Sequence, residues 1–512
     1  MPSTPVLILD FGSQYTQLIA RAVRSLHVYC EIHPYNLSPE RIQALRPQAL
    51  ILSGSPFSHY QSGAPTPDPL VWTLGIPILG ICYGMQLVAA RFGGKIELHD
   101  SREYGYARLQ IPRPHPLLAK LEGEEQVWMS HGDSVSLLPR DFVALASTAS
   151  VPYAAIAHQT EPVFALQFHP EVAHTVSGKT ILANFVLDIA GCRADWTPDS
   201  FIQTAVQAIR SQVGASKVIL GLSGGVDSSV AAVLLHRAIG NQLIPIFVDN
   251  GCMRFNEAER VRAAFAGVEG IEIDFVDAAD LFLERLAGVS DPEKKRKIIG
   301  AAFIEVFERE AAKHQDAGFL AQGTLYPDVI ESVSLRGPSA TIKSHHNVGG
   351  LPEKMNLRLI EPLRELFKDE VREVGRELGL PEELVGRHPF PGPGLAVRIV
   401  GEVDADKIRR LQAIDEIFIS ELRKCGLYGA TWQAFAVLLP IQSVGVMGDE
   451  RSYANVCALR AVNSVDGMTA DWTELPFDFL KRVSNRIINE VPGVNRVVYD
   501  ISSKPPATIE WE

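Results

Sequence analysis

Residues 223–229 combine two glycines, three serines and one aspartate, a composition suited to binding phosphate. They are Ser223, Gly224, Gly225, Val226, Asp227, Ser228 and Ser229. An aliphatic run at 217–220 precedes them and a helical pattern at 230–239 follows, so they should join a buried strand to a helix. Glycines let backbone N–H groups converge on an anion, and the helix N-terminus adds positive charge. A tight turn with a Ser or Asp cap is the alternative, but the combined features favour phosphate.

A cysteine between two glycines, in Gly80-Ile81-Cys82-Tyr83-Gly84, has the spacing of a nucleophile. It follows a strand-like run and precedes a helical one. The glycines permit the sharp turn of a nucleophile elbow, and the helix N-terminus stabilises the reactive thiolate. A buried structural cysteine is the alternative, which the paired glycines disfavour.

The base that such a nucleophile needs is predicted at His169, within Phe168-His169-Pro170-Glu171. Proline pushes the preceding residue into an extended conformation. In an extended segment residues i and i+2 point the same way, so Glu171 should lie beside the imidazole and fix its tautomer. The sequence therefore predicts a Cys–His–Glu triad.

These motifs resemble those of class I glutamine amidotransferases. The resemblance implies that Cys82 is the nucleophile, His169 the general base and acid, and Glu171 its orienting carboxylate. It also implies an oxyanion hole and a glutamine site formed by other residues. The oxyanion donors are the N–H groups of Ser55 and Tyr83, and the glutamine contacts are Gln86, Ser130 and His131. Ser55 stands where the family pattern Ser-Gly-Gly-Pro has its second glycine.

The phosphate loop lacks the Gly-Lys-Ser/Thr of a Walker A motif and resembles the Ser-Gly-Gly-x-Asp-Ser loop of the ATP pyrophosphatase family. The resemblance implies that residues 223–229 bind ATP, release pyrophosphate and transfer AMP to an acceptor oxygen. Asp227 would then be a ligand of Mg²⁺, which prefers carboxylate and phosphate oxygens. A basic run at 291–300 is either a solvated helix face or a mobile lid that neutralises polyphosphate.

Strand-like runs alternate with helical patterns around both motifs, which is typical of parallel α/β sheets. The segment His-Pro-Phe-Pro-Gly-Pro-Gly at 388–394 cannot form regular structure. Beyond it we expect a helix at 404–425, strands near 434–446 and 453–462, and a helix near 477–490. The predicted fold is two consecutive mostly parallel-sheet α/β domains, 1–195 and 196–387, followed by a smaller α+β domain, 388–512.

The overall composition is that of a large globular protein, with 512 residues of which 46% are hydrophobic. The net charge of −12 argues against a broad nucleic-acid surface. The six cysteines are scattered, without a zinc or disulfide pattern, which fits a reduced, cytoplasmic location. No apolar run approaches the roughly 20 residues of a membrane helix, so we expect neither a nucleic acid nor a membrane as partner.

Over its full length the chain resembles the bacterial glutamine-hydrolysing GMP synthase family, through both motif sets, residues 388–394 and the tail Ser-Lys-Pro-Pro-Ala-Thr-Ile-Glu-Trp-Glu. The resemblance implies that XMP is activated by ATP to an adenyl-XMP intermediate and aminated with glutamine-derived ammonia, giving GMP, AMP, pyrophosphate and glutamate. It implies a homodimer formed through the third domain. By position, the XMP contacts would be Arg254, Asp328, Gln433, Arg496, Lys504 and Glu510.

The sequence leaves three alternatives. One is another glutamine-dependent amide synthetase of the ATP pyrophosphatase type, such as NAD synthetase. A second is an RNA-modifying enzyme with the same loop, which the absence of paired cysteines and of a basic surface disfavours. A third is a regulatory protein with an inactive amidotransferase fold, which the complete triad disfavours.

Overall fold

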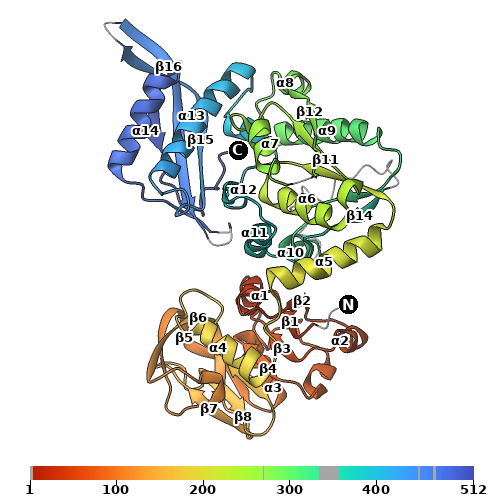
Figure 1. Ribbon diagram of the computed structural model, residues 1–512. Helices are drawn as coiled ribbons and strands as arrows, with labels where there is room; N and C mark the ends of the chain where they lie inside the picture. Colours follow the sequence, from red (N-terminus) through yellow and green to blue (C-terminus); the bar gives the residue numbers. More distant parts are fainter. Residues whose placement is uncertain (1–3, 269, 334–356, 448–449, 465–466, 468) are drawn as a thin grey trace. The chain divides into compact units, whose positions relative to one another are not determined.

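The computed structural model describes residues 4–268, 270–333, 357–447, 450–464, 467 and 469–512. The chain divides into two compact units (Figure 1). Of the described residues, the first contains 4–201 together with 327–333, and the second contains 202–326 and those from 357 to 512. Among the described residues, no helix has the length and apolar character needed to cross a membrane.

The first unit is built on a seven-stranded sheet with the order β2-β1-β3-β4-β9-β8-β7. The first five strands in this order are parallel, and β8 and β7 are antiparallel additions. The strands are β1 (Val6–Asp10), β2 (Cys30–Pro34), β3 (Ala49–Leu52), β4 (Ile78–Ile81), β7 (Phe142–Ala146), β8 (Ala155–His158) and β9 (Val163–Leu166). Strands β1, β3, β4 and β9 are short aliphatic runs, in agreement with the strand–helix alternation that predicts a mostly parallel sheet.

Helices and one long hairpin complete the first unit. The hairpin pairs β5 (Lys95–Gln110) with β6 (Glu124–Leu137) in a separate two-stranded sheet. The helices are α1 (Thr16–Arg24), α2 (Pro39–Leu45), α3 (Tyr83–Arg91) and α4 (Gly178–Ala183). The carboxyl ends of β1, β3, β4 and β9 meet at one edge of the sheet, where α/β proteins place their sites.

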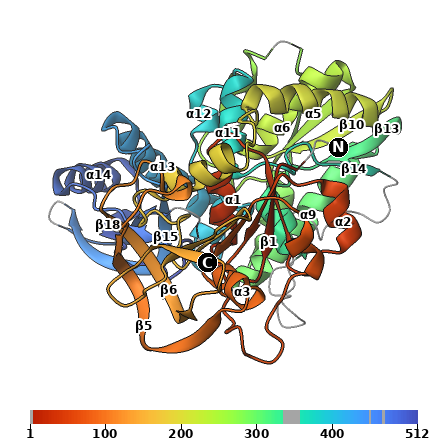
Figure 2. The ribbon, with the colours of Figure 1, turned by 90° about the horizontal axis from the view of Figure 1, so that it is seen from below.

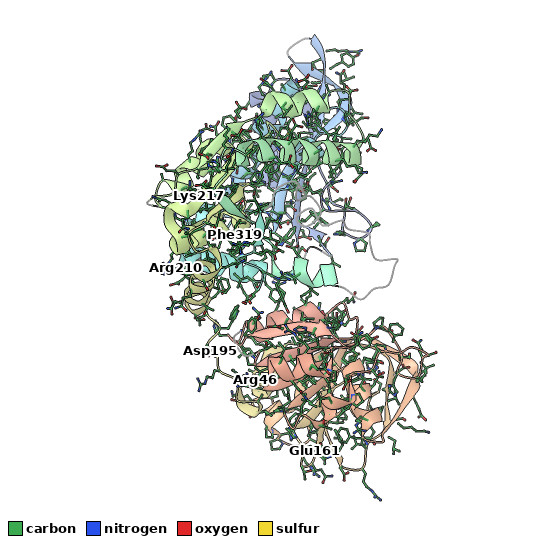
Figure 3. The ribbon with its side chains drawn as sticks, turned by 90° about the vertical axis from the view of Figure 1, so that its right-hand side faces the viewer. Arg46, Glu161, Asp195, Arg210, Lys217 and Phe319 are labelled. Carbon is green, nitrogen blue, oxygen red and sulfur yellow. The ribbon has the colours of Figure 1, made fainter. Side chains whose placement is uncertain are left out.

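The second unit begins with a five-stranded parallel sheet of order β12-β11-β10-β13-β14. Its strands are β10 (Lys217–Leu222), β11 (Leu243–Asp249), β12 (Asp274–Asp277), β13 (Ala317–Ala321) and β14 (Arg358–Ile360). Figure 3 labels Lys217 and Phe319 on the neighbouring strands β10 and β13. The order reverses at β10, which places the carboxyl end of this strand at the switch point of the sheet.

Helices cover both faces of this parallel sheet. In Figures 1 and 2, α6 (Val226–Ile239) and α9 (Pro292–Ala311) lie on opposite faces. This follows from right-handed crossovers that run outward from β10 in one direction and return in the other. The other helices of this part are α5 (Pro198–Val213), α7 (Glu257–Phe265), α8 (Ala279–Leu286), α11 (Lys368–Glu377) and α12 (Glu382–Val385). Helix α10 (Tyr326–Val333) follows β13, but from residue 327 on it clusters with the first unit.

A smaller α+β part completes the second unit, as the sequence predicts. Its sheet contains β15 (Gln433–Met447), β16 (Glu450–Asn463), β17 (Asp471–Trp472) and β18 (Val494–Tyr499). Its helices are α13 (Ala405–Lys424) and α14 (Phe477–Glu490). One hydrophobic core runs through both parts, because Ile219 of β10 and Phe418 of α13 belong to the same buried cluster. The predicted fold class is confirmed.

Candidate active sites

Cys82 follows β4 directly, and its backbone adopts a conformation that is rare for a non-glycine residue. Its φ is 55° and its ψ is −103°, and such strained residues cluster at functional sites. A Cβ atom on Gly80 would lie 2.5 Å from the carbonyl oxygen of Gly84, and one on Gly84 would overlap the carbonyl oxygen of Leu52. The turn therefore requires glycine on both sides of Cys82, as in a nucleophile elbow.

The carboxyl ends of β4 and β9 bring Cys82 and His169 together in the interior of the unit. Nδ1 of His169 lies 2.7 Å from Oε1 of Glu171, and both side chains are buried. Cys82 lies close enough to the imidazole to contribute to the raised pKa of His169. Tyr15 packs edge-on against the imidazole, with ring centroids 4.9 Å apart. The three side chains predicted as a triad thus form one continuous series of contacts.

Charges around His169 favour its protonated form. Burial by itself lowers the pKa of His169, but the carboxylate of Glu171 and the thiolate of Cys82 raise this pKa well above its ordinary value. The favoured state of His169 is therefore the imidazolium. A thiolate is the reactive form of cysteine, and an imidazolium can donate a proton to a leaving group.

The residues predicted to bind glutamine lie around the same cysteine. Sγ of Cys82 is 3.6 Å from the carbonyl oxygen of Ser130. The side-chain amide of Gln86 donates to the carbonyl oxygen of Asp133 at 3.1 Å. His131 is buried on the same strand, β6, with Nε2 3.3 Å from Oε2 of Glu103. Strand β6 therefore brings these predicted contacts next to the nucleophile and its helix.

The structure gives the backbone surroundings of the two predicted oxyanion donors, whose role stays a prediction. Ser55 is not among the residues with positive φ, so its side chain causes no left-handed strain. Its hydroxyl accepts a hydrogen bond from the N–H of Phe57 at 3.2 Å. Tyr83 begins α3, where backbone N–H groups lack an acceptor within the helix.

The phosphate loop joins β10 to α6, as the sequence predicts, and its hydroxyls bond to the loop itself. Oγ of Ser228 accepts from the N–H of Ser223 at 3.2 Å and lies 3.0 Å from Oγ of Ser223. Gly224 has a φ of +73°, which glycine adopts without strain. Helix α6 begins at Val226, earlier than the helical run expected from 230, so the helix N-terminus lies inside the loop.

Asp227 forms an ion pair with a lysine that the sequence analysis did not select. Its two carboxylate oxygens lie 2.5 and 2.6 Å from Nζ of Lys368, the first residue of α11. No group of three or more His, Cys, Asp or Glu side chains suited to a metal occurs in the described part of the chain. The role of Asp227 as one ligand of a Mg²⁺ ion, with phosphate oxygens and water as the other ligands, therefore stays a prediction.

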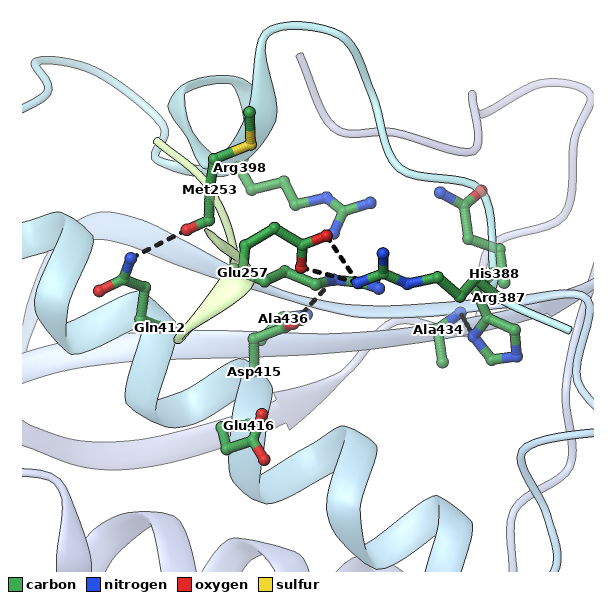
Figure 4. Close-up of polar contacts among 12 residues, drawn as sticks. Met253, Glu257, Arg387, His388, Arg398, Gln412, Asp415, Glu416, Ala434 and Ala436 are labelled. Atoms are coloured by element: carbon green, nitrogen blue, oxygen red, sulfur yellow. Dashed lines mark hydrogen bonds and ion pairs between the residues drawn. The ribbon is translucent and has the colours of Figure 1, made fainter. Parts of the chain in front are cut away.

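A cavity of about 320 Å³ opens beside the phosphate loop. Arg387 forms part of the wall of this cavity. Its Nη2 lies 2.6 Å from Oε1 of Glu257, and its Nη1 donates to the carbonyl oxygen of Gly224 at 2.7 Å. Figure 4 shows the contact between Arg387 and Glu257. The lining consists of residues 223–227, Met253, Arg254, Glu257, Lys368, Arg372 and 387–392. This volume lies within the range of small-molecule sites.

Three of the six predicted XMP contacts are linked through the cavity wall. The amide of Gln433 donates to Oε1 of Glu510 at 2.8 Å and to the carbonyl oxygen of Pro389 at 3.2 Å. Arg254 lines the cavity and lies over the ring of Phe390, 4.8 Å from its centroid. Pro389 and Phe390 are themselves part of the lining, so they connect Arg254 to the Gln433–Glu510 pair.

Arg496 lies away from this group within the chain. It donates to the hydroxyl of Ser443 at 2.7 Å. On β16, Val456 faces Arg496 and Val462 faces Gln433. The distance between these two positions is roughly 20 Å at the usual rise of a strand.

The two remaining predicted contacts also have other surroundings. Nζ of Lys504 donates to the carbonyl oxygen of Gly467 at 2.8 Å. Asp328 lies in the first turn of α10, in the stretch that clusters with the first unit. The structure therefore does not add these residues to the Arg254, Gln433 and Glu510 group.

Neither interpretation of the basic run at 291–300, a solvated helix face or a mobile lid, is correct for its central lysine. Asp291 caps α9, as its side chain accepts from the N–H of Lys294 at 2.8 Å. Lys295 is fully buried, and its Nζ lies 2.5 Å from Oε2 of Glu512 and 2.7 Å from the carbonyl oxygen of Ile399. Sequence patterning missed this because the carboxylate partner lies 217 residues away.

Sequence signals existed for some of the residues that the sequence analysis missed. Gln167 precedes His169 by two positions, so strand alternation places it on the same side, and its amide nitrogen is 4.0 Å from Sγ of Cys82. Arg387 directly precedes the segment 388–394. Lys368 lies 141 residues from Asp227, and no motif surrounds it.

Three family models match consecutive parts of the chain. Glutamine amidotransferase class-I matches residues 7–189. NAD synthase matches residues 200–281, and GMP synthase C terminal domain matches residues 420–511. The match of residues 200–281 would also be expected of an NAD synthetase, which is one of the alternatives. Relatives that match the whole length of the chain therefore decide between an NAD synthetase and a GMP synthase.

Full-length relatives carry the name of one enzyme. A glutamine-hydrolysing GMP synthase from Christiangramia forsetii is 59% identical and covers 99% of each chain. Another from Aquifex aeolicus is 57% identical and covers 100% of each. Among solved structures, a protein from Thermoplasma acidophilum described as one subunit of a GMP synthase is 30% identical, covering 37% of this chain and 96% of its own with a TM-score of 0.32.

Proposed function

The chain belongs to the family of glutamine-hydrolysing GMP synthases, and we propose that it converts XMP, ATP, glutamine and water to GMP, AMP, pyrophosphate and glutamate. The observation that carries the proposal is the presence of both required sets of reactive groups. One is the buried series Cys82–His169–Glu171. The other is a phosphate loop beside a cavity that Arg254 also lines.

In the first unit we assign the hydrolysis of glutamine to the triad. The thiolate of Cys82 attacks the side-chain amide carbon, and the N–H groups of Ser55 and Tyr83 stabilise the developing oxyanion. Protonated His169 donates its proton to the leaving ammonia. His169 then takes a proton from water, which hydrolyses the thioester to glutamate. Glutamine itself is held by Gln86, Ser130 and His131.

In the second unit we assign adenylation to the loop 223–229. Its backbone N–H groups and hydroxyls bind the β- and γ-phosphates, while the purine O2 of XMP attacks the α-phosphorus and pyrophosphate leaves. Asp227 would hold Mg²⁺, which neutralises phosphate charge. Ammonia then attacks C2 of the purine and AMP leaves. The surroundings of Arg254, Gln433 and Glu510 support their role in binding XMP, while that of Arg496, Lys504 and Asp328 rests on the family resemblance.

We further propose three domains, with the bounds 1–195, 196–387 and 388–512, a cytoplasmic location and a homodimer formed through the third domain. Large apolar side chains that are exposed on β15 and β16, such as Ile441, Val444 and Tyr453, support the homodimer. All six cysteines are free thiols, which fits a reducing compartment. Light scattering of the purified protein tests the homodimer, and a mass near the 56.1 kDa of one chain would contradict it.

The overall function is tested by asking which nucleotide stimulates cleavage of ATP to AMP and pyrophosphate. The assay contains Mg²⁺ and ammonium, with XMP, with deamido-NAD, or with neither. We expect AMP formation that depends on XMP. Stimulation by deamido-NAD alone would instead support an NAD synthetase.

A further inference from the structure

Three fully buried cations hold the segment 500–512 against the rest of the second unit. Arg460 donates to the carbonyl oxygens of Ser502, Thr508 and Ile509 at 3.0, 2.9 and 2.8 Å. Lys295 pairs with Glu512 and Arg398 pairs with Glu510. All three cations have 0% exposure. Of the three, Arg398 is the one that binds a side chain proposed to contact XMP.

The contact between Arg398 and Glu510 fixes the plane of the carboxylate. Nε of Arg398 donates to Oε2 at 3.1 Å, and Nη2 donates to Oε1 at 2.8 Å. Two parallel hydrogen bonds of this kind define both the distance and the rotation of a carboxylate. The guanidinium is itself fixed between aromatic rings, 4.1 Å from the centroid of Phe435 and 5.1 Å from that of Phe390.

The hydrogen bonds of Glu510 leave one acceptor position on its carboxylate. A carboxylate has about four lone-pair sites. Oε1 accepts from both Arg398 and Gln433, and Oε2 accepts from Arg398. With respect to the described residues, the vacant site is therefore on Oε2. The side chain of Glu510 is 21% exposed while that of Arg398 is 0% exposed, so a ligand can reach the carboxylate but not the guanidinium.

We propose that Arg398 is a positioning residue, which directs the vacant lone pair of Glu510 Oε2 at a ring N–H of the xanthine base of XMP. The inference rests on the proposed function, in which Glu510 contacts XMP. Xanthine carries N–H donors at N1 and N3, and a carboxylate is a pure acceptor. A lysine at 398 keeps the charge but not the two-pronged geometry, so Arg398→Lys separates orientation from charge.

The experiment measures the KM for XMP, the KM for ATP and kcat, with ammonium as nitrogen source so that glutamine hydrolysis is not required. Arg398→Lys should raise the KM for XMP about 10- to 100-fold, the effect of a lost charge-assisted hydrogen bond. The KM for ATP should change less than about twofold, because the phosphate loop is unaltered. This selective effect on one KM would not follow from general destabilisation.

Arg460→Lys is the matched control, because Arg460 is equally buried and binds the same segment through three backbone carbonyl oxygens and the side chain of Asp500, none of which is proposed to contact XMP. It should lower the melting temperature and change the KM for XMP by less than about threefold. A rise as large as that in Arg398→Lys would overturn the inference, since any anchor of the segment would then have the same effect.

A double-mutant cycle with Glu510→Gln separates this inference from the proposed function. Glu510→Gln alone should raise the KM for XMP, and adding Arg398→Lys should raise it no further. If Glu510→Gln leaves this KM unchanged, the proposed XMP contact is wrong and the inference falls with it. If Glu510→Gln raises the KM for XMP and Arg398→Lys raises it further by its own factor in the double variant, only the role of Arg398 is wrong.

Glu510→Asp keeps the test decisive if the Arg398 variants do not fold. It leaves the buried guanidinium in place and retains the negative charge, but withdraws the carboxylate from the paired geometry by one methylene. The KM for XMP should rise with little change in the KM for ATP. An unchanged KM for XMP in folded Glu510→Asp would overturn the inference.

Discussion

The two candidate sites differ in how much of their chemistry is in place before a substrate binds. Around Cys82 the reactive groups already contact one another, and Glu171 and Cys82 hold His169 in its charged form. In the phosphate loop the serines bond to the loop itself, and Asp227 is paired with Lys368. A thiol nucleophile must be activated in advance, whereas a polyphosphate brings its own charge, so a loop of neutral donors suffices.

Two buried histidines, His169 and His388, differ in the same way, since only one of them is held in a reactive charge state. His388 stacks on Tyr428 with ring centroids 3.7 Å apart, and its Nδ1 accepts from the N–H of Ala434 at 3.2 Å. Burial lowers the pKa of His388 to about 4, while Glu171 and Cys82 raise that of His169. Carboxylate and thiolate neighbours favour a proton donor, and backbone partners favour a neutral structural group.

The largest effect is expected for Cys82→Ala, which removes the nucleophile from the preformed site. Glutamine-dependent GMP formation should fall by several powers of ten. Ammonium-dependent formation should persist, and rise with pH as more ammonia is unprotonated, because adenylation needs only the other site. The measurement is GMP formed from each nitrogen source by both proteins. Substantial glutamine-dependent activity would exclude Cys82 as the nucleophile, and loss of both activities in a folded variant would mean that the sites are not separable.

Glu171→Gln should have the next largest effect, because it removes the charge that holds His169 protonated. We expect kcat/KM for glutamine hydrolysis to fall about 10⁴-fold, as in other triads whose carboxylate is replaced by an amide. The raised pKa of His169 keeps the imidazolium present to higher pH. Without the carboxylate this pKa falls, so the alkaline limb of the pH profile should move to lower pH. An alkaline limb at the wild-type position would show that Glu171 does not set the charge of His169.

Asp227→Asn should affect the other site by a smaller factor, about 10² in the rate of XMP-dependent AMP formation. The phosphate oxygens of ATP still bind Mg²⁺, so only one ligand is lost. Glutamine hydrolysis by the triad supplies the internal control. Raising the concentration of Mg²⁺ should recover part of the activity, and a normal rate of pyrophosphate release would refute the role as metal ligand.

Local sequence patterns predicted those elements whose structure depends on residues close together in the sequence. The buried aliphatic strands, the glycine-bounded Cys82 and the spacing of His169 and Glu171 were all readable, because each depends on residues near in sequence. The two α/β sheets followed from strand and helix alternation. The long hairpin β5–β6 was not predicted, although it carries Ser130 and His131, because its largely polar alternation has no strong apolar signal.

Partners that are distant in sequence could not be predicted in the same way. Lys368 and Asp227, Lys295 and Glu512, and Arg398 and Glu510 are joined by tertiary packing over 141, 217 and 112 residues. A charged residue looks the same in a sequence whether it is solvated or buried in a pair. The run containing Lys295 was therefore interpreted as a solvated face or a lid, neither of which fits the burial of this lysine, and Arg398 was not selected at all.

The smallest effect on catalysis is expected for His388→Gln, which tests whether this histidine is purely structural. Loss of a histidine that transferred protons would lower the rate by several powers of ten. For His388→Gln we expect an ammonium-dependent kcat within about threefold of wild type.

The effect of His388→Gln should instead appear in the stability of the protein at low pH. In the folded protein the pKa is about 4 against an ordinary 6.5, so the unfolded state takes up this proton first. Stability is unaffected above pH 6.5 and is lost as the pH falls from 6.5 towards 4, by about 3 kcal/mol in full. Glutamine cannot titrate, so urea unfolding of the variant should depend less steeply on pH across this window, although the variant is less stable at pH 7 through the lost stacking on Tyr428. Equal pH dependence in both proteins would show that His388 is not held neutral by the fold.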